Sequence, residues 1–329
     1  MKSLKQIIAC GLLMLMACSG LQAQETVRIT NIGRGYYAGP LYVAMRERLF
    51  EKYGLKADVT FVKGGALAFQ SVFTRDADFG VLSYEHILTG AAQGRNLVSI
   101  FNVTNRPLNN IVVSEELFQA NKDKTLKEKI LALKGARIGA PSAGGSGEKM
   151  LGVLGRDFGL DMAKQTSLVF LGTEAASYVG AFQTKTINVA IPFEPAGVMV
   201  QQKGLGRTLV NLMNGEVERF RDLIFMTLAT HPTTLKDKPE LVKKVVAVFA
   251  EAQAILLDPN RGPQIMGAEF SEMNAASNQQ AYDVVRPIWS SNGRMSLEGA
   301  KKVNDYLQPT GTVAIDFGKT FTNQFLPEK

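Results

Sequence analysis

The sequence is poor in the side chains that most often carry covalent or metal chemistry. Its 329 residues include two cysteines and two histidines, and the histidines, His86 and His231, stand far apart and outside any H-E-x-x-H spacing. A zinc site is therefore not indicated, and we expect no metal and no cofactor. The sequence also lacks a G-x-S-x-G motif, which argues against a serine hydrolase. We expect His86 on a helix surface or at the edge of a cleft.

Both cysteines, Cys10 and Cys18, lie in the first 23 residues. This segment combines a basic start, an apolar run that ends at Cys18 and small residues near Ala23, and it has no acidic residue. The pattern is typical of a secretory signal peptide, since the run is shorter than the roughly 20 residues that span a bilayer. We predict that residues 1–23 are a signal peptide, cleaved after Ala23 to release a soluble protein. As an alternative, residues 15–18 resemble a lipobox, and cleavage there would leave a lipoprotein anchored through Cys18.

Charge is also scarce and evenly spread. Lys and Arg number 37 against 30 Asp and Glu, which gives a formal net charge of +7. The signal segment holds two of the lysines, so the mature chain carries +5. No run of five basic residues occurs, and nucleic-acid binding is not indicated. Hydrophobic residues make up 46% of the chain, enough for a buried core, but beyond residue 23 no apolar stretch reaches about 18 residues, the length of a membrane helix.

Segments rich in β-branched residues alternate with helical patterns from the start of the mature chain. Strands are predicted at 26–32, 56–62, 78–82 and 97–103, with helices that begin at Pro40 and Ala66 and a third that ends at Gln93. This alternation predicts a parallel sheet with right-handed crossovers.

The alternation restarts near Ile111, which indicates a second lobe. Strands are predicted at 111–113, 136–140, 167–171 and 188–191, and helices at 145–158, 174–183 and 195–203. After a strand at 222–228 only helices follow, at 239–257, 263–272, 278–289 and 296–307. We expect these last helices to pack on one face of an existing sheet.

Two glycine-rich turns stand between a strand and a helix. The first, at 33–38, fits the dinucleotide fingerprint, but the second strand ends in Lys63 where an acid should hold the ribose, so nucleotide binding is not favoured. The second, at 139–147, lacks the lysine of a Walker A loop. It is either a flexible connection or a helix cap in which Ser142 and Ser146 present donors to a ligand. Two such turns, one in each lobe, would face each other across a cleft.

Short motifs along the whole mature chain stand in an order typical of one family. They are Y-A-G-P-L-Y-V-A at 37–44, Y-G-L at 53–55, G-G at 64–65, A-D-F-G at 77–80, L-K-G-A-R-I-G at 133–139, F-G-L at 158–160 and N-V-A-I-P-F-E-P at 188–195. With the export signal, they resemble the solute-binding proteins of bacterial ABC importers, in the nitrate/taurine/alkanesulfonate group that includes binders of thiamine-pyrimidine precursors. The chain departs from the family at 48–50, where Gly-Phe-Phe is common, at Asn188, where an acid is frequent, and at Phe193, where Trp often stands in the pocket.

The resemblance implies an α/β, two-lobed periplasmic-binding-protein fold of type II. Each lobe would be a mostly parallel sheet flanked by helices, and two crossovers would form a hinge. Lobe 1 would combine residues 24–107 with 222–329, and lobe 2 would be residues 108–221. The resemblance also implies a monomer in the periplasm that works with an ABC permease and ATPase complex in the inner membrane.

By analogy with the family, ligand-binding residues are expected in the turns that follow the strands. The candidates are Tyr36, Tyr37, Ala38, Gly64, Gly65, Ser83, Tyr84, Ser142, Gly144, Gly145, Ser146, Phe193 and Glu194. The aromatic rings would sandwich a planar or apolar part of the ligand, and N–H groups with serine hydroxyls would hold a charged end. For each single aromatic residue, ordinary core packing is the alternative.

The function expected from this resemblance is the capture of a small organic solute and its delivery to the permease. Helix N-termini favour an anion such as a sulfonate or carboxylate, while Glu194 leaves room for an amine or a pyrimidine. Two alternatives stay open: an enzyme on the same fold, like the desulfinase and pyrimidine synthase among the family's relatives, or a ligand-sensing partner of a histidine kinase. The lack of cysteine after residue 23 argues against the enzyme.

Overall fold

The structure is a computed structural model that describes residues 24–307 and 314–328. The predicted signal peptide at 1–23, and with it the lipobox alternative at Cys18, lies outside the described residues. Within the described ranges, no helix is both long and apolar enough to cross a membrane.

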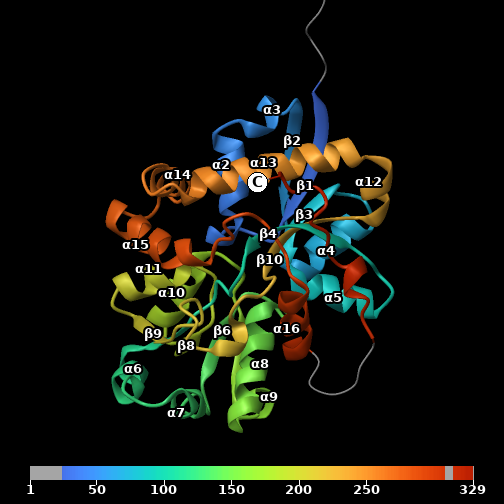
Figure 1. The fold of residues 1–329 in the computed structure, drawn as a ribbon. Helices are drawn as coiled ribbons and strands as arrows, with labels where there is room; N and C mark the ends of the chain where they lie inside the picture. The colour runs from blue at the N-terminus through green and yellow to red at the C-terminus, as the bar shows by residue number, and fades with distance from the viewer. Residues whose placement is uncertain (1–23, 308–313, 329) are drawn as a thin grey trace, which may run out of the picture.

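The first sheet has five strands, in the order β2-β1-β3-β10-β4 (Figure 1). They are β1 (Glu25–Asn31), β2 (Leu55–Phe61), β3 (Phe79–Ser83), β4 (Val98–Thr104) and β10 (Met226–Thr230). Strands β2, β1 and β3 run parallel, and β10 runs antiparallel to both β3 and β4. β3, β4 and β10 are buried along their whole length, so this sheet forms the centre of the upper half of the molecule.

The second sheet repeats this arrangement in the order β7-β6-β8-β5-β9. Its strands are β5 (Ile111–Ser114), β6 (Arg137–Ala140), β7 (Ser167–Phe170), β8 (Val189–Ala190) and β9 (Gly206–Val210). Strands β7, β6 and β8 are parallel, and β5 runs antiparallel to β8 and β9. Each sheet therefore has one antiparallel strand in the same place, and in each case it is the first strand that the chain forms after crossing from the other sheet.

The chain crosses between the sheets twice, over residues 105–110 and 211–225. The predicted lobe boundaries, between 107 and 108 and between 221 and 222, fall inside these two segments. The predicted α/β fold, with two mostly parallel sheets flanked by helices, is confirmed. That the lobes move about the crossing segments stays a prediction.

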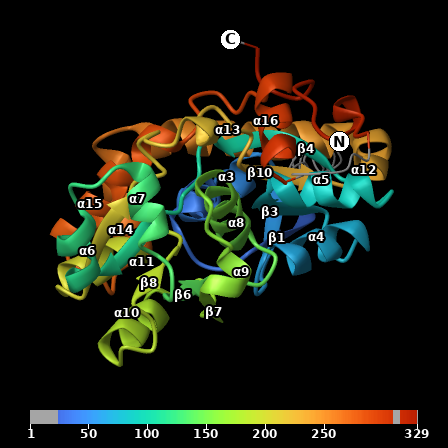
Figure 2. The same ribbon diagram turned by 90° about the horizontal axis from the view of Figure 1, so that it is seen from below.

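Helices cover both sheets (Figures 1 and 2). Those that follow the first sheet's strands are η1 (Tyr36–Ala38), α2 (Gly39–Arg46), α3 (Leu49–Lys52), α4 (Gly65–Phe73) and α5 (Tyr84–Ala92). Those around the second sheet are α6 (Glu115–Asn121), α7 (Leu126–Leu131), α8 (Ser146–Phe158), α9 (Met162–Gln165), α10 (Ala175–Gln183) and α11 (Ala196–Gln202). The C-terminal part contains α12 (Pro232–Asp237), α13 (Pro239–Leu257), α14 (Arg261–Glu269), α15 (Ala275–Val285) and α16 (Leu297–Leu307), and the 3-10 turns are η2 (Glu218–Phe220), η3 (Arg286–Ile288) and η4 (Phe317–Lys319).

Local sequence explains where several helices begin and end. Pro40 stands in the first turn of α2, where the missing N–H costs nothing. Thr125 and Glu128 form a capping box at the start of α7. Gly159 ends α8 in the left-handed conformation at φ 84°, which glycine adopts without strain.

The C-terminal helices differ from the expectation that they pack on one face of an existing sheet. α13 does pack on α2, α3 and β4 of the first half, but α15 contacts α11 and α16 contacts α8, both of the second half. These two helices therefore connect the two halves of the molecule, and α16 lies beside α8 in Figure 1. The predicted strand at 222–228 was also placed too early: β10 spans Met226–Thr230, and Asp222 has a left-handed φ of 55° that a strand excludes.

Candidate binding cavity

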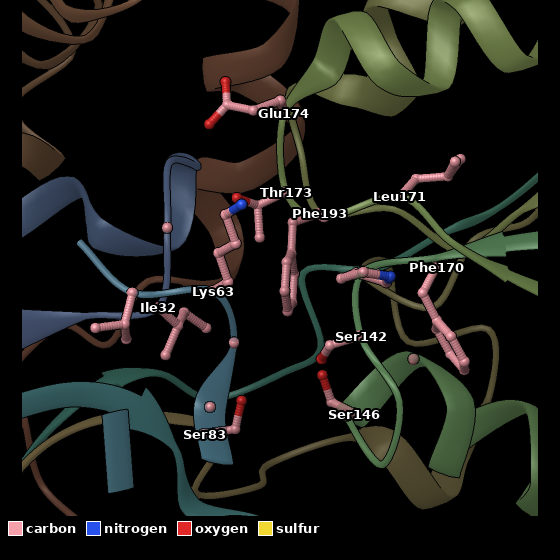
Figure 3. Close-up of a pocket in the computed structure, with 18 of the residues that line it drawn as sticks. Ile32, Lys63, Ser83, Ser142, Ser146, Phe170, Leu171, Thr173, Glu174 and Phe193 are labelled. Carbon is pink, nitrogen blue, oxygen red and sulfur yellow. The ribbon is translucent and has the colours of Figure 1, made fainter. Parts of the chain in front are cut away.

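A cavity of about 600 Å³ lies between the two sheets. Its walls are the segments that leave the carboxyl ends of β1, β2 and β3 on one side and of β6 and β7 on the other. The ends of parallel strands are where α/β proteins bind ligands, because the chain turns there from strand to helix and exposes backbone groups. Figure 3 shows side chains from both sheets converging on this space.

The structure brings about half of the sequence-predicted residues together around the cavity. Those in its lining are Gly64, Gly65, Ser83, Ser142, Gly145, Ser146 and Phe193. The side chains of Ser142 and Ser146 point toward one another (Figure 3). Their position suits ligand binding, which stays a prediction.

The other candidates lie outside the lining. Tyr36, Tyr37, Ala38 and Tyr84 are fully buried in the core. The Tyr36 ring packs 4.8 Å from the Phe270 ring and its hydroxyl donates to Asn278 Oδ1 at 3.0 Å. The Tyr84 hydroxyl bonds the Thr320 hydroxyl at 2.5 Å. For Tyr36 and Tyr84 the packing alternative therefore describes the structure, because their hydroxyls are satisfied by residues far along the chain.

Tyr37 and Glu194 support the wall of the cavity from behind. The Tyr37 ring packs 5.0 Å from the ring of Phe193, which does line the cavity. The Glu194 carbonyl accepts from the Tyr36 N–H at 3.0 Å, and its carboxyl accepts from the Val198 N–H at 3.0 Å. Burial raises the pKa of the Glu194 carboxyl to about 7, although hydrogen bonds from Val198 and Gly197 act to lower it.

Gly144 is exposed just outside the lining, on the turn before α8. Its N–H donates to the Glu148 carboxylate at 2.7 Å. This bond ties the turn to the first turn of its own helix, while the choice between a flexible connection and a ligand-binding turn stays open.

Four helices begin at the cavity: α4 after Gly64, α5 after Ser83, α8 after Gly145 and α10 after Glu174. In none of the four does the side chain of the N-cap residue accept a hydrogen bond from the first turn. The first-turn N–H groups of a helix have no partner within the helix and carry a partial positive charge. Their convergence on one cavity favours a negatively charged or strongly hydrogen-bonding group.

The two sides of the cavity approach each other closely at glycines. Gly64 has a φ of 103°, and a Cβ added there would lie 3.3 Å from the Ser142 side chain of the opposite side. A Cβ on Gly33 would overlap the Thr173 side chain, and the Arg34 N–H donates to the Thr173 hydroxyl at 3.3 Å. Glycine is therefore favoured at both positions for its backbone conformation, since Gly33 has a φ of 126°, and at Gly33 also for space.

His86 of α5 lines the cavity, in agreement with its expected place at a cleft edge. Burial lowers its pKa to about 3, with a further contribution from Lys149, so the ring is neutral. Its Nε2 atom occupies the place that a Cβ on Gly65 would need. Beside it, the buried Glu85 of α5 and Lys149 of α8 form an ion pair of 3.8 Å between Oε1 and Nζ, which joins the two sides.

Sequence reasoning missed several residues of the lining. Among them are an exposed cation, Lys63, an exposed acid, Glu174, and two half-exposed rings, Phe61 and Phe170. All four stand at or just after the end of an outer strand, β2 or β7. The rule that ligands lie at the carboxyl ends of parallel strands would have selected them. In the described part of the chain, no group of three or more His, Cys, Asp or Glu could hold a metal ion.

Comparison with known proteins adds sequence and structural relatives. A family model described as NMT1/THI5 like matches residues 36–261. The "Putative binding protein YtlA" of Bacillus subtilis is 22% identical over 243 residues, which cover 73% of this chain and 68% of YtlA.

Solved structures share the fold at low sequence identity. One from Bordetella bronchiseptica RB50 has a TM-score of 0.80 at 20% identity, and the match covers 91% of this chain and 95% of that one. The alkanesulfonate-binding protein SsuA from Xanthomonas axonopodis pv. citri, bound to MOPS, has a TM-score of 0.67 at 19% identity, and the match covers 84% and 89% of the two chains.

Proposed function

Because the chain belongs to the NMT1/THI5-like family, we propose that it is an exported substrate-binding protein of an ABC importer. In this proposal, the cavity between the two sheets captures a small organic anion, and the loaded protein delivers it to the permease and ATPase complex of the inner membrane. The protein acts as a monomer and carries out no reaction.

One observation carries the proposal: four helices with no side-chain cap begin at a single cavity between two sheets. Each helix N-terminus stabilises an anion by roughly 0.3–1 kcal/mol, and by more where the site is partly buried. Two of the helices come from each sheet, so an anion held by all four would also hold the two halves together. We assign ligand binding to the lining residues Gly64, Gly65, Ser83, Ser142, Gly145, Ser146 and Phe193, with Lys63 as a nearby cation.

The relatives support a sulfonate as the ligand class, and the helix N-termini suit a carboxylate equally well. SsuA is named for alkanesulfonate binding and was solved with MOPS bound. In the sequence, Glu194 suggested an amine or a pyrimidine as the ligand. Its carboxyl is not in the cavity lining and accepts a hydrogen bond from the first turn of α11, so it does not support either ligand.

Binding is tested by calorimetric titration of the purified protein with a sulfonate, a carboxylate, an amine and a pyrimidine. The proposal predicts one binding site per chain with micromolar affinity for an anion. Absence of binding by every anion, with a folded protein, would contradict it. Product formation from a bound ligand would instead favour the enzyme alternative.

Export is tested separately by the intact mass of the protein from the exported fraction of its host. We propose a soluble chain that begins at Gln24, in the periplasm. If the chain instead begins at a lipid-modified Cys18, the protein is an anchored lipoprotein and the proposal of a soluble protein is wrong.

A further inference from the structure

The cavity is large for the smallest anions of the ligand class proposed above. Its volume of about 600 Å³ corresponds to the liquid volume of roughly twenty water molecules. An inorganic oxyanion or a two-carbon sulfonate would fill a small part of this space. The unfilled remainder would hold water against apolar walls, which is unfavourable.

The walls are apolar over much of their area. Apolar side chains from both sides line the cavity, namely Ile32, Phe61, Val62, Pro141, Phe170, Leu171 and Phe193. Only two charged side chains, Lys63 and Glu174, stand in the lining among the described residues. One charged group on the ligand is therefore matched by Lys63 and the helix N-termini, and the rest of the space suits an apolar body.

Phe61 and Phe170 are the unusual members of this wall. They are 48% and 47% exposed, while Phe193 is 5% exposed and fixed by the Tyr37 ring. In the described part of the chain, neither Phe61 nor Phe170 packs against another aromatic ring. Leaving such rings half in water costs free energy that a ligand can recover by covering them.

The two rings occupy equivalent places in the two sheets. Phe61 is the last residue of the outer strand β2, paired in register with Asn31 of β1. Phe170 is the last residue of the outer strand β7, paired in register with Ala140 of β6. Each ring thus stands at the carboxyl end of an edge strand and reaches the same cavity from opposite sides.

We propose that Phe61 and Phe170 set the specificity of the cavity by enclosing the aromatic body of an aryl sulfonate or aryl carboxylate. The inference rests on the proposed function, because it takes the cavity as the anion site. The charged end of the ligand lies toward Lys63 and the first turns of α4 and α8, and the aromatic body lies between the two phenylalanines. The rings proposed to contact the ligand are therefore those of two phenylalanines at the edge strands, and not the buried tyrosines that the sequence suggested.

The test is a titration of the purified protein with two matched pairs of anions: methanesulfonate against 2-naphthalenesulfonate, and acetate against 2-naphthoate. Within at least one pair, the aryl anion should bind at least about tenfold more tightly. Phe61→Ala and Phe170→Ala should each weaken aryl binding by about tenfold and leave binding of the small anion within about twofold. Leu67→Ala is the matched control, since Leu67 is 54% exposed on α4 but outside the lining.

The outcomes separate the inference from the proposed function. If small anions bind and aryl anions bind no more tightly, the cavity binds anions but the aromatic specificity is wrong. Equal weakening of small and aryl anions by the two substitutions, or no effect on either, would also overturn the inference. If none of the four anions binds a folded protein, the proposed function fails together with it.

Discussion

At the scale of single residues, the cavity depends on a few side chains whose neighbours are far away in the sequence. Lys63 extends toward Thr173 of the opposite side in Figure 3. Gly65 leaves room for His86, and Glu194 ties Tyr36 to the start of α11. Each of these contacts gives a prediction that one substitution can test.

Lys63→Gln should weaken binding of an anionic ligand by about three- to tenfold and should reduce the dependence of the affinity on salt, because a charge near the ligand is removed. Lys56→Gln is the control, since Lys56 lies on β2, the strand that leads to Lys63, is exposed and is absent from the lining. Calorimetric titration at two salt concentrations measures both effects. If the two variants bind the anion with equal affinity, Lys63 does not contribute to the binding site.

Gly65→Ala should lower the free energy of unfolding by roughly 1–3 kcal/mol, because the new Cβ overlaps the His86 ring. Gly180→Ala is the control: Gly180 lies in α10 with nothing within 4 Å of an added Cβ, so alanine should be neutral or stabilising there. Denaturant unfolding measures both changes. Adding His86→Ala to Gly65→Ala should restore stability, and failure to do so would mean that the cost has another cause.

Glu194→Gln should change the pH dependence of stability. The Glu194 carboxyl has a pKa of about 7 in the folded protein, against 4.5 ordinarily. Below pH 4.5 the carboxyl is protonated in both the folded and the unfolded chain, so it does not lower the free energy of unfolding. As the pH rises from 4.5 to 7 the unfolded chain releases the proton first, and the free energy of unfolding therefore falls. Between pH 4.5 and pH 8, the free energy of unfolding of the variant should therefore rise by roughly 3 kcal/mol relative to that of the wild type. Parallel curves of unfolding free energy against pH would contradict this.

At the scale of secondary-structure elements, periodicity predicted most of the fold. β2, β3, α4 and α13 lie within one residue of their predicted places, because their apolar residues alternate or recur clearly. β9 was missed; it follows the predicted helix at 195–203 after a turn at Gly204, whose φ is 66°. The short helices α3, α9 and α12 were also missed, since four to six residues are too few to show a period.

The contact between α5 and α8 shows what local patterns leave out. Glu85 has no exposed side-chain surface, and its partner Lys149 is 25% exposed. Neither residue is marked by a motif, and they meet only because the two sheets face each other. Removing one partner of such an ion pair is destabilising, because the other charge is left buried without a partner.

Lys149→Met should therefore lower the free energy of unfolding by roughly 1–3 kcal/mol. Adding Glu85→Gln should recover part of this loss, because it removes the uncompensated charge. Lys164→Met is the control: Lys164 pairs with Asp161 on the surface, is 84% exposed and should change stability by less than about 0.5 kcal/mol. Strictly additive effects of the Lys149 and Glu85 substitutions would show that the pair is not coupled.

At the scale of the whole molecule, two sheets of the same strand order face one cavity, and the chain crosses between them twice. The α15 and α16 helices add contacts between the halves that the sequence did not suggest. The glycines and serines that line the cavity were predictable, because ligands of α/β proteins lie where parallel strands end.

The aromatic part was not predictable, because a ring that follows a strand can turn either to the cleft or to the core. Tyr36 turns to the core, where it meets Phe270 and Trp289 from the other end of the chain. Only the assembled fold decides between these directions. For the same reason, the exposed Phe61 and Phe170 became candidates only once the two edge strands were placed on opposite sides of one cavity.

The central claim is that one organic anion is held between the two sheets. The most direct measurement is a crystal structure of the protein with the tightest-binding anion from the titrations. The account predicts that the charged group lies in the cavity and accepts hydrogen bonds from the first turns of both α4 and α8, one from each side. An anion bound elsewhere, or in contact with residues of only one side, would contradict it.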